Sequence, residues 1–186
     1  MNVAKLKNLL QKETVAEKTD AKESAVIIPL LMNKNDWVII FEKKPGYDRL
    51  HPGQIAFPGG SKEDKDKTFL DTATRETYEE VGIQKQELSI LGQEKPLCTL
   101  TTNFLIYPFV GVVKKQPPYT INRQEVEKLF FVPVKFLIKN PPRPNIYIYK
   151  KKPVETLMIN FNKEAIWGAT ARILHNFIPK LQKACE

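Results

Sequence analysis

The sequence has few cysteines, few histidines and no long apolar run. Its two cysteines, Cys98 in mid-chain and Cys185 beside the last residue, do not favour a structural disulfide, and alone they cannot build a zinc site. No run of about 18 apolar residues occurs, so we expect no membrane-spanning helix. The first residues, MNVAKLKNLLQKET, lack the apolar core of a signal peptide. These absences favour a cytoplasmic protein without a membrane partner.

Charge is unevenly distributed between the two signs. Lysine and arginine number 29 against 21 aspartates and glutamates, which gives a net charge of +8. Such a surface could favour phosphate-rich partners, although a solvated lysine-rich surface is the preferred explanation. No basic stripe interleaved with aromatics occurs, and the run of three lysines at 150–152 precedes a proline, as is typical of a turn. We therefore predict no nucleic-acid partner.

The order of predicted elements favours one mixed domain. Apolar spacing predicts a helix over 3–12, and a polar loop follows through residue 24. Mixed strands and helices then predict a single α/β (α+β) domain over residues 25–186. Helices are expected at 70–81, ended by Gly82, and at 163–182, which Pro179 should bend or shorten. Strands are expected at 25–32, 36–44, 54–57, 87–92, 104–113, 128–134, 145–149 and 156–161.

The stretch RETYEEVGI, residues 75–83, crowds three glutamates into five positions. On a helix, Glu76 and Glu80 lie about 40° apart around the axis, and Glu79 lies roughly 60° to the other side of Glu76. Such like charges cost roughly a few tenths of a kcal/mol per pair. A solvated acidic face is the ordinary explanation of such a cluster. The functional explanation is a divalent cation such as Mg²⁺, which binds carboxylates together with substrate phosphates.

A glycine-containing loop precedes this helix. In FPGGSKEDKDK, residues 57–67, Gly59 and Gly60 allow the backbone to approach a metal or phosphate closely. A Pro-Gly-Gly sequence alone indicates only a turn. Its combination with the acidic helix that follows is far more specific.

Together these residues resemble the Nudix box, G-x5-E-x7-R-E-U-x-E-E-x-G-U, in which U is aliphatic. The second half matches at every charged position, and only Thr77 replaces an aliphatic residue. The segment from Gly60 to Arg75 is one residue longer than the pattern. Counted forward from Gly60, the early acid is Asp66; counted back from Arg75, the position holds Lys67. We prefer the forward count.

Residues 39–60, IIFEKKPGYDRLHPGQIAFPGG, resemble a further pattern of the coenzyme A diphosphatase branch, L-L-T-x-R-S-x3-R-x3-G-x3-F-P-G-G. Arg49, Gly53 and the segment 57–60 fall in step with it. Lys44 and Pro45 stand where that pattern has arginine and serine. The match is therefore good at its downstream end and weaker upstream.

The resemblance implies a Nudix-type α/β/α sandwich around a mixed β-sheet. It implies Mg²⁺- or Mn²⁺-dependent hydrolysis of a pyrophosphate bond in a nucleoside diphosphate derivative. The residues that it assigns are Glu76, Glu79, Glu80 and the Gly59 carbonyl as metal ligands, Arg75, Glu76 and Glu79 in catalysis, and Arg49, Lys44 and Gly60 at the substrate.

Several roles stay open at this stage. Arg75 would orient a box glutamate through an ion pair, although a surface pair with Glu79 is the alternative. The general base is Glu76 or a loop acid, Glu125 or Glu127. The aromatics Phe104, Tyr107 and Phe109 are predicted to be sheet core, with base stacking as the alternative.

The preferred substrate is coenzyme A or an acyl derivative, cut to adenosine 3′,5′-bisphosphate and (acyl-)phosphopantetheine. ADP-ribose or a nucleoside triphosphate is the second enzymatic hypothesis, and a non-catalytic nucleotide-binding module is the third. The expected partner is a small nucleoside diphosphate derivative, and a homodimer is left open.

Overall fold

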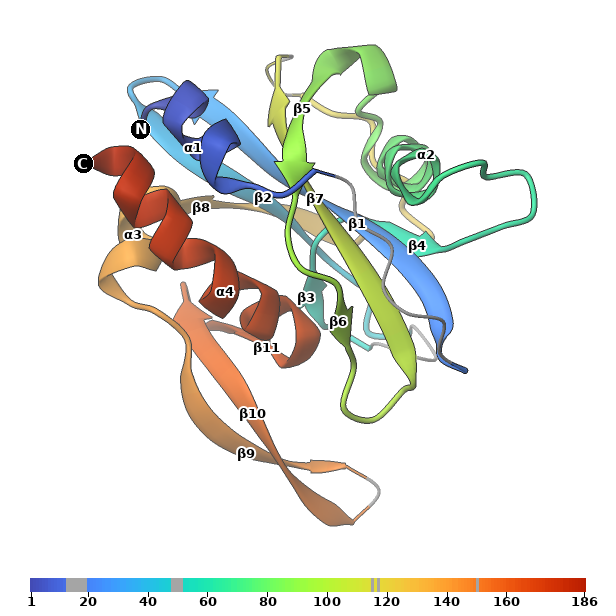
Figure 1. Ribbon diagram of the computed structural model, residues 1–186. Coiled ribbons are helices and arrows are strands. Elements are labelled where there is room, and N and C mark those ends of the chain that lie inside the picture. The colour runs from blue at the N-terminus through green and yellow to red at the C-terminus, as the bar shows by residue number, and fades with distance from the viewer. Residues whose placement is uncertain (13–19, 48–51, 115, 117, 150) are drawn as a thin grey trace.

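The computed structural model describes residues 1–12, 20–47, 52–114, 116, 118–149 and 151–186 (Figure 1). It contains an eight-stranded sheet and a separate three-stranded sheet. The elements run in the order α1 (Val3–Leu9), β1 (Lys22–Asn33), β2 (Asp36–Lys43), β3 (Ile55–Ala56), β4 (Gly59–Ser61), α2 (Phe69–Val81), η1 (Lys85–Glu87), β5 (Leu88–Gln93), β6 (Leu97–Cys98), β7 (Phe104–Val113), β8 (Lys128–Pro133), α3 (Val134–Lys139), β9 (Arg143–Tyr149), β10 (Lys152–Phe161), β11 (Glu164–Trp167) and α4 (Gly168–Cys185).

Parallel and antiparallel pairs occur together in the large sheet. Its main order is β3-β2-β1-β7-β5, with β4, β6 and β8 paired at its sides. Strands β1 and β2 form an antiparallel hairpin, whereas β1 and β7 run parallel over most of their length. Such a parallel pair must be joined by a long crossover, and here the crossover contains α2. The predicted mixed sheet is confirmed.

Helices cover both faces of this sheet. Successive side chains on a strand point to opposite faces, so one strand can contribute apolar residues to both cores. On β1, Ile28 and Leu30 join the core beneath α1 and α4, whereas Ala25 and Ile27 join the core beneath α2. Figure 1 shows α1 and α4 together on one side of the sheet and α2 on the other. The architecture is therefore the expected α/β/α sandwich.

The C-terminal region departs from the sequence-based prediction. Residues 164–167 were expected to begin the last helix, but they form β11, which pairs with β10 so that Trp167 lies opposite Met158. The helix α4 begins only at Gly168, whose φ of 67° provides the turn out of the strand. Pro179 lies inside α4, which continues to Cys185. The predicted shortening at Pro179 was therefore wrong, and the late start of α4 follows from the pairing of β11 with β10.

Further differences concern element boundaries and short elements. Strand β1 begins at Lys22 rather than at residue 25, since it pairs with β7 from Phe104 onward. Helix α1 ends at Leu9 rather than at residue 12. The Gly59–Ser61 segment is a strand paired with β1 instead of a simple turn, and the short helix α3 was not predicted. Each difference depends on pairing or packing with a distant segment.

Other features of the fold bear on the earlier expectations. Cys98 and Cys185 are both free and exposed. Within the described ranges, no helix combines the length and hydropathy that crossing a bilayer would require. The β9–β10 hairpin projects from the body of the protein in Figure 1 and carries two exposed isoleucines, Ile146 and Ile148.

Candidate active site

Helix α2 carries the acid cluster, and capping interactions close in sequence determine where this helix begins and ends. The Thr68 side chain accepts from the Asp71 backbone N–H at 3.1 Å, and the Asp71 carboxylate accepts from the Thr68 backbone N–H at 3.1 Å. This capping box starts the helix. Gly82 ends it at a φ of 71°, with its N–H donating to the Tyr78 carbonyl at 2.9 Å.

One face of α2 packs on the sheet and thereby orients the acids. Phe69, Ala73, Thr77 and Val81 are buried on this face. Thr77 is tolerated where the pattern has an aliphatic residue, because its hydroxyl donates to the Ala73 carbonyl at 2.6 Å. The glutamates therefore project along β4 and β2 rather than into the apolar core.

The two glycines of β4 allow these acids to approach the backbone. The Gly59 N–H donates to Oε2 of Glu80 at 2.8 Å. A Cβ placed on Gly60 would lie 2.5 Å from the carboxyl carbon of Glu76. A Cβ on Gly59, whose φ is 151°, would lie 2.3 Å from the Ala25 carbonyl oxygen. Any larger residue at either position would displace a carboxylate or the strand.

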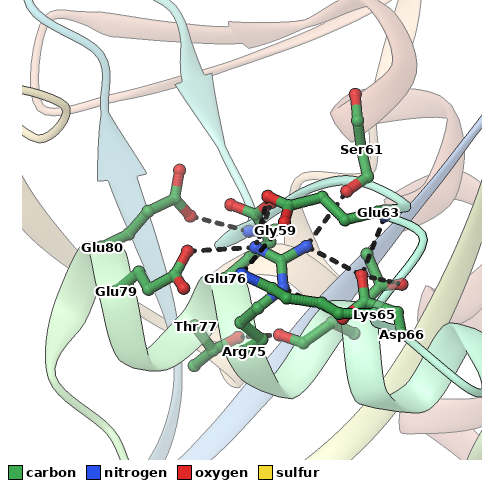
Figure 2. Close-up of polar contacts among 12 residues, drawn as sticks. Gly59, Ser61, Glu63, Lys65, Asp66, Arg75, Glu76, Thr77, Glu79 and Glu80 are labelled. Atoms are coloured by element: carbon green, nitrogen blue, oxygen red, sulfur yellow. Dashed lines mark hydrogen bonds and ion pairs between the residues drawn. The ribbon is translucent and has the colours of Figure 1, made fainter.

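Arg75 organises the outer part of the cluster (Figure 2). Its Nε and Nη2 donate to the two carboxylate oxygens of Asp66 at 3.0 and 2.9 Å. Its Nη1 donates to Glu76 at 2.9 Å and to Glu79 at 3.0 Å. Arg75 thus makes both of the ion pairs considered from the sequence, one with Glu76 and one with Glu79, four residues later on the helix.

Asp66 occupies the position of the early acid, as the forward count predicts. Besides Arg75, it accepts from the Thr72 hydroxyl and the Glu63 N–H, each at 3.0 Å. The hydrogen bonds from Arg75 are the main reason that the pKa of Asp66 lies well below its ordinary value. Lys67 is exposed. Asp66 therefore holds the guanidinium from the side opposite to the glutamates.

The three glutamates of α2 differ in environment. The side chain of Glu80 is 2% exposed and that of Glu76 is 15% exposed, whereas that of Glu79 is 45% exposed. Burial raises the pKa of Glu76, despite its bond from Arg75. Burial likewise raises the pKa of Glu80 against the opposing effects of Lys44 and Gly59. Two of the three predicted ligands thus lie in a desolvated site.

A fourth carboxylate, Glu42 on β2, joins the cluster. It is wholly buried, and its Oε1 lies 2.7 Å from Nζ of Lys44. The same ammonium also pairs with Glu80. Burial and the nearby Glu80 carboxylate raise the pKa of Glu42 well above its ordinary value. Sequence reasoning missed Glu42; the available signal was the alternation along β2, which puts it on the same face as Val38 and Ile40, facing α2.

Lys44 lies in the site that was predicted for it but faces acids. Burial disfavours its charge, yet the carboxylates of Glu42 and Glu80 outweigh that effect and raise its pKa.

Arg49 lies outside the described residues. Glu125 accepts from the Asn122 amide at 3.1 Å and Glu127 lies 3.6 Å from Lys43, and neither lines the cavity beside the acids.

That cavity has a volume of about 540 Å³, and its lining contains two kinds of residue. Its polar wall includes Lys44, Gly59, Gly60, Glu76 and Glu80. Its apolar wall includes Phe57, Phe104, Ile106, Trp167 and Ile173, most of which come from segments distant in sequence from α2. Tyr107 and Phe109 are core residues, as predicted, whereas Phe104 lines this cavity. With a divalent cation on its carboxylates, the cavity suits a ligand with an anionic part and an apolar or aromatic part.

The donor set fits a divalent cation. Glu76, Glu80 and the Gly59 carbonyl supply the oxygen atoms that Mg²⁺ and Mn²⁺ prefer. In the described part of the chain, no three acidic, histidine or cysteine side chains already surround one point. Lys44 contacts Glu42 and Glu80, while Arg75 contacts Glu76 and Glu79. The positively charged side chains of Lys44 and Arg75 therefore offset part of the negative charge of these carboxylates.

Comparison with known proteins agrees with this site. Residues 21–153 match the family model for the NUDIX domain. The Nudix hydrolase NudL of Photorhabdus laumondii, described as uncharacterized, is 30% identical over 87% of this chain and 86% of its own length. The NudL of Pectobacterium atrosepticum is 28% identical over 83% of this chain and 80% of its own length.

Solved structures show the same fold at low sequence identity. A MutT/nudix family protein from Enterococcus faecalis has a TM-score of 0.58 and 12% identity, covering 93% of this chain and 70% of that one. The MutT protein of Methanosarcina mazei has a TM-score of 0.56 and 13% identity, covering 91% of this chain and 99% of that one. By the family model, its NudL relatives and its fold, the chain belongs to the NUDIX domain family and is a Nudix hydrolase.

Proposed function

We propose that this Nudix hydrolase cleaves the pyrophosphate bond of coenzyme A or acyl-coenzyme A. The products would be adenosine 3′,5′-bisphosphate and (acyl-)phosphopantetheine, and Mg²⁺ or Mn²⁺ would support the reaction. The observation that carries the proposal is the cavity whose lining combines buried carboxylates with apolar and aromatic side chains. A pyrophosphate flanked by a nucleoside and a long organic arm needs both kinds of surface.

In this proposal the polar wall holds the reacting group. Glu76, Glu80 and the Gly59 carbonyl would bind the divalent cation, with Glu79 at the outer edge. Such a cation neutralises charge on the pyrophosphate and activates water for attack. Arg75 fixes the carboxylates of Glu76 and Glu79 through its two Nη1 contacts.

Glu76 is the proposed general base. It lines the cavity and approaches the Gly60 backbone, whereas the other two candidates, Glu125 and Glu127, are engaged elsewhere. A base must lie within reach of the proton that it accepts. Gly60 serves the substrate by leaving room beside Glu76, and Arg49 stays a predicted phosphate ligand.

The apolar wall would bind the organic part of the substrate. Phe104 on β7 and Trp167 at the end of β11 both line the cavity, as does Ile173 on α4. Flat aromatic side chains suit an adenine ring, and apolar side chains suit a pantetheine or acyl arm. Phe57, Gly59 and Gly60 of the coenzyme A pattern line the same cavity.

Two alternatives compete with this substrate. An Ap4A hydrolase of Caenorhabditis elegans and the NUDIX domain of Shewanella oneidensis NrtR, solved with ADP-ribose, share the fold at TM-scores of 0.53. ADP-ribose and nucleoside triphosphates are therefore the second class of candidates. A binding module without catalysis is disfavoured, because it would have no need to retain mutually repelling carboxylates.

The test is a substrate panel with the purified protein. Coenzyme A, acetyl-coenzyme A, ADP-ribose, diadenosine tetraphosphate and nucleoside triphosphates would each be incubated with Mg²⁺ or Mn²⁺, and the products identified by mass. We expect adenosine 3′,5′-bisphosphate from coenzyme A, and about 10³-fold slower release of it by a Glu80→Gln variant. Rapid cleavage of ADP-ribose with coenzyme A untouched would refute the substrate assignment. Nucleotide binding without any cleavage would favour the module.

Three further expectations stay predictions. The homodimer can be tested by light scattering on a sizing column. The cytoplasmic location and the absence of nucleic-acid and membrane partners require localisation and binding assays.

A further inference from the structure

Glu42 is a fully buried charged residue. Its side chain is 0% exposed, its Oε1 lies 2.7 Å from the Lys44 ammonium, and the only other charged group that acts on it in the described part of the chain is the Glu80 carboxylate. Buried carboxylates are normally paired and hydrogen-bonded, because burial removes the water that solvates them. Glu42 therefore depends on the ammonium of Lys44.

The geometry of β2 explains why this ammonium also reaches α2. Glu42 and Lys44 are two residues apart, so they point to the same face of the sheet, where α2 lies. Lys43, between them, points to the other face and pairs with Glu164 at 3.0 Å. Lys44 consequently extends to Glu80, so that one positive charge bridges two buried carboxylates from different elements.

We propose that the Lys44 ammonium takes, between Glu42 and Glu80, the place of a divalent cation, and that Glu42 is a positioning residue that holds it there. The inference rests on the proposed metal-dependent function. An ammonium is a compact point charge, as a metal ion is, and two facing carboxylates are a typical divalent-cation pair. Lys44 would thereby limit how many divalent ions the site binds.

Two opposite consequences follow for the variants. Without Lys44, Glu42 and Glu80 face one another uncompensated and should accept one additional divalent ion. Without the Glu42 charge, Lys44 pairs with Glu80 alone and competes with the metal for that ligand. Removing both charges leaves the net charge of the site unchanged and should restore the original binding.

The experiment measures Mn²⁺ binding by isothermal titration calorimetry and electron paramagnetic resonance, without substrate. We expect Lys44→Met to bind one more Mn²⁺ per chain than the unmodified protein. We expect Glu42→Gln to bind Mn²⁺ about tenfold more weakly, the size typical of losing a group that orients a ligand. The double variant should return to the original stoichiometry and affinity. Lys43→Met, which removes a lysine from the other face of β2, should change neither.

Circular dichroism and thermal melting would establish that each variant is folded. If Lys44→Met does not fold, Glu42→Gln and the double variant still decide the matter through their affinities. Equal stoichiometry and affinity in all folded variants would overturn the inference while leaving the proposed function intact. No Mn²⁺ binding by the unmodified protein would instead overturn both.

Discussion

Glu79 and Glu80 are adjacent, chemically identical and differently placed. The side chain of Glu79 is 45% exposed and bonds to Arg75 at 3.0 Å. That of Glu80 is 2% exposed and receives the Gly59 N–H at 2.8 Å as well as the Lys44 ammonium. One residue of helix turns the side chain by about 100°, which here separates a solvated outer pair from a desolvated inner one. The comparison shows that tertiary partners decide what each acid can do.

The largest effect is expected when Glu79 and Glu80 are each replaced by glutamine, the isosteric amide. We expect Glu80→Gln to lower kcat/KM about 10³-fold, because it removes a charge from the desolvated cavity where electrostatic groups act most strongly. Glu79→Gln should lower it only about tenfold, since the exposed position is better screened by solvent. Steady-state kinetics on the substrate identified by the panel would measure both. Equal losses would contradict the distinction between inner and outer acids.

A second test moves Glu76 without changing its charge. Gly60→Ala would place a methyl group 2.5 Å from the Glu76 carboxyl carbon, so we expect kcat to fall about 10²-fold, as for a misplacement of about 1 Å. In contrast, the methyl group of Gly59→Ala would meet the backbone of Ala25 and Val26, so this substitution should lower the melting temperature. Normal turnover in Gly60→Ala would show that the position of Glu76 is not critical.

A third test concerns the support behind the outer pair. We expect Asp66→Asn to lower the free energy of unfolding by about 2 kcal/mol near neutral pH, because Arg75 loses a bidentate charged partner. Interaction with Arg75 depresses the pKa of Asp66 in the folded protein. Its stabilisation is therefore complete above the unfolded pKa of about 3.9 and is lost as pH falls below that value.

Thermal melts of both proteins between neutral and strongly acidic pH would check this prediction. The difference in melting temperature should stay constant above pH of about 5 and shrink in more acidic solution. A difference that grows on acidification would contradict the assigned ion pair.

The smallest expected effect is on stability at the outer acid. Glu79→Gln removes an exposed i,i+4 pair, worth roughly 0.3–0.5 kcal/mol, while Arg75 keeps Asp66 and Glu76. Chemical denaturation should therefore show almost no change in the midpoint. A loss as large as that of Asp66→Asn would mean that Glu79 is part of the buried network.

Local chemistry made much of α2 predictable. Its apolar spacing, the left-handed Gly82 and the choice of Asp66 over Lys67 all agree with the structure. Each depends on residues close in sequence or on a fixed helical period. The early start of β1 and the strand β11 were not predictable in this way, because β1 is extended by its pairing with β7 and β11 exists only through its pairing with β10.

The same distinction between local and long-range causes applies to the residues of the site. The sequence places Glu76, Glu79 and Glu80 on one side of a helix, since that placement needs only the geometry of a helix, and the resemblance to the Nudix box adds Gly59 and Gly60 to the site. The contact of Lys44 with both Glu42 and Glu80, and the aromatic residues that line the same cavity, were decided by the tertiary structure. The physical reason is that burial and charge compensation depend on segments that meet only after the sheet has formed and α4 has packed against it.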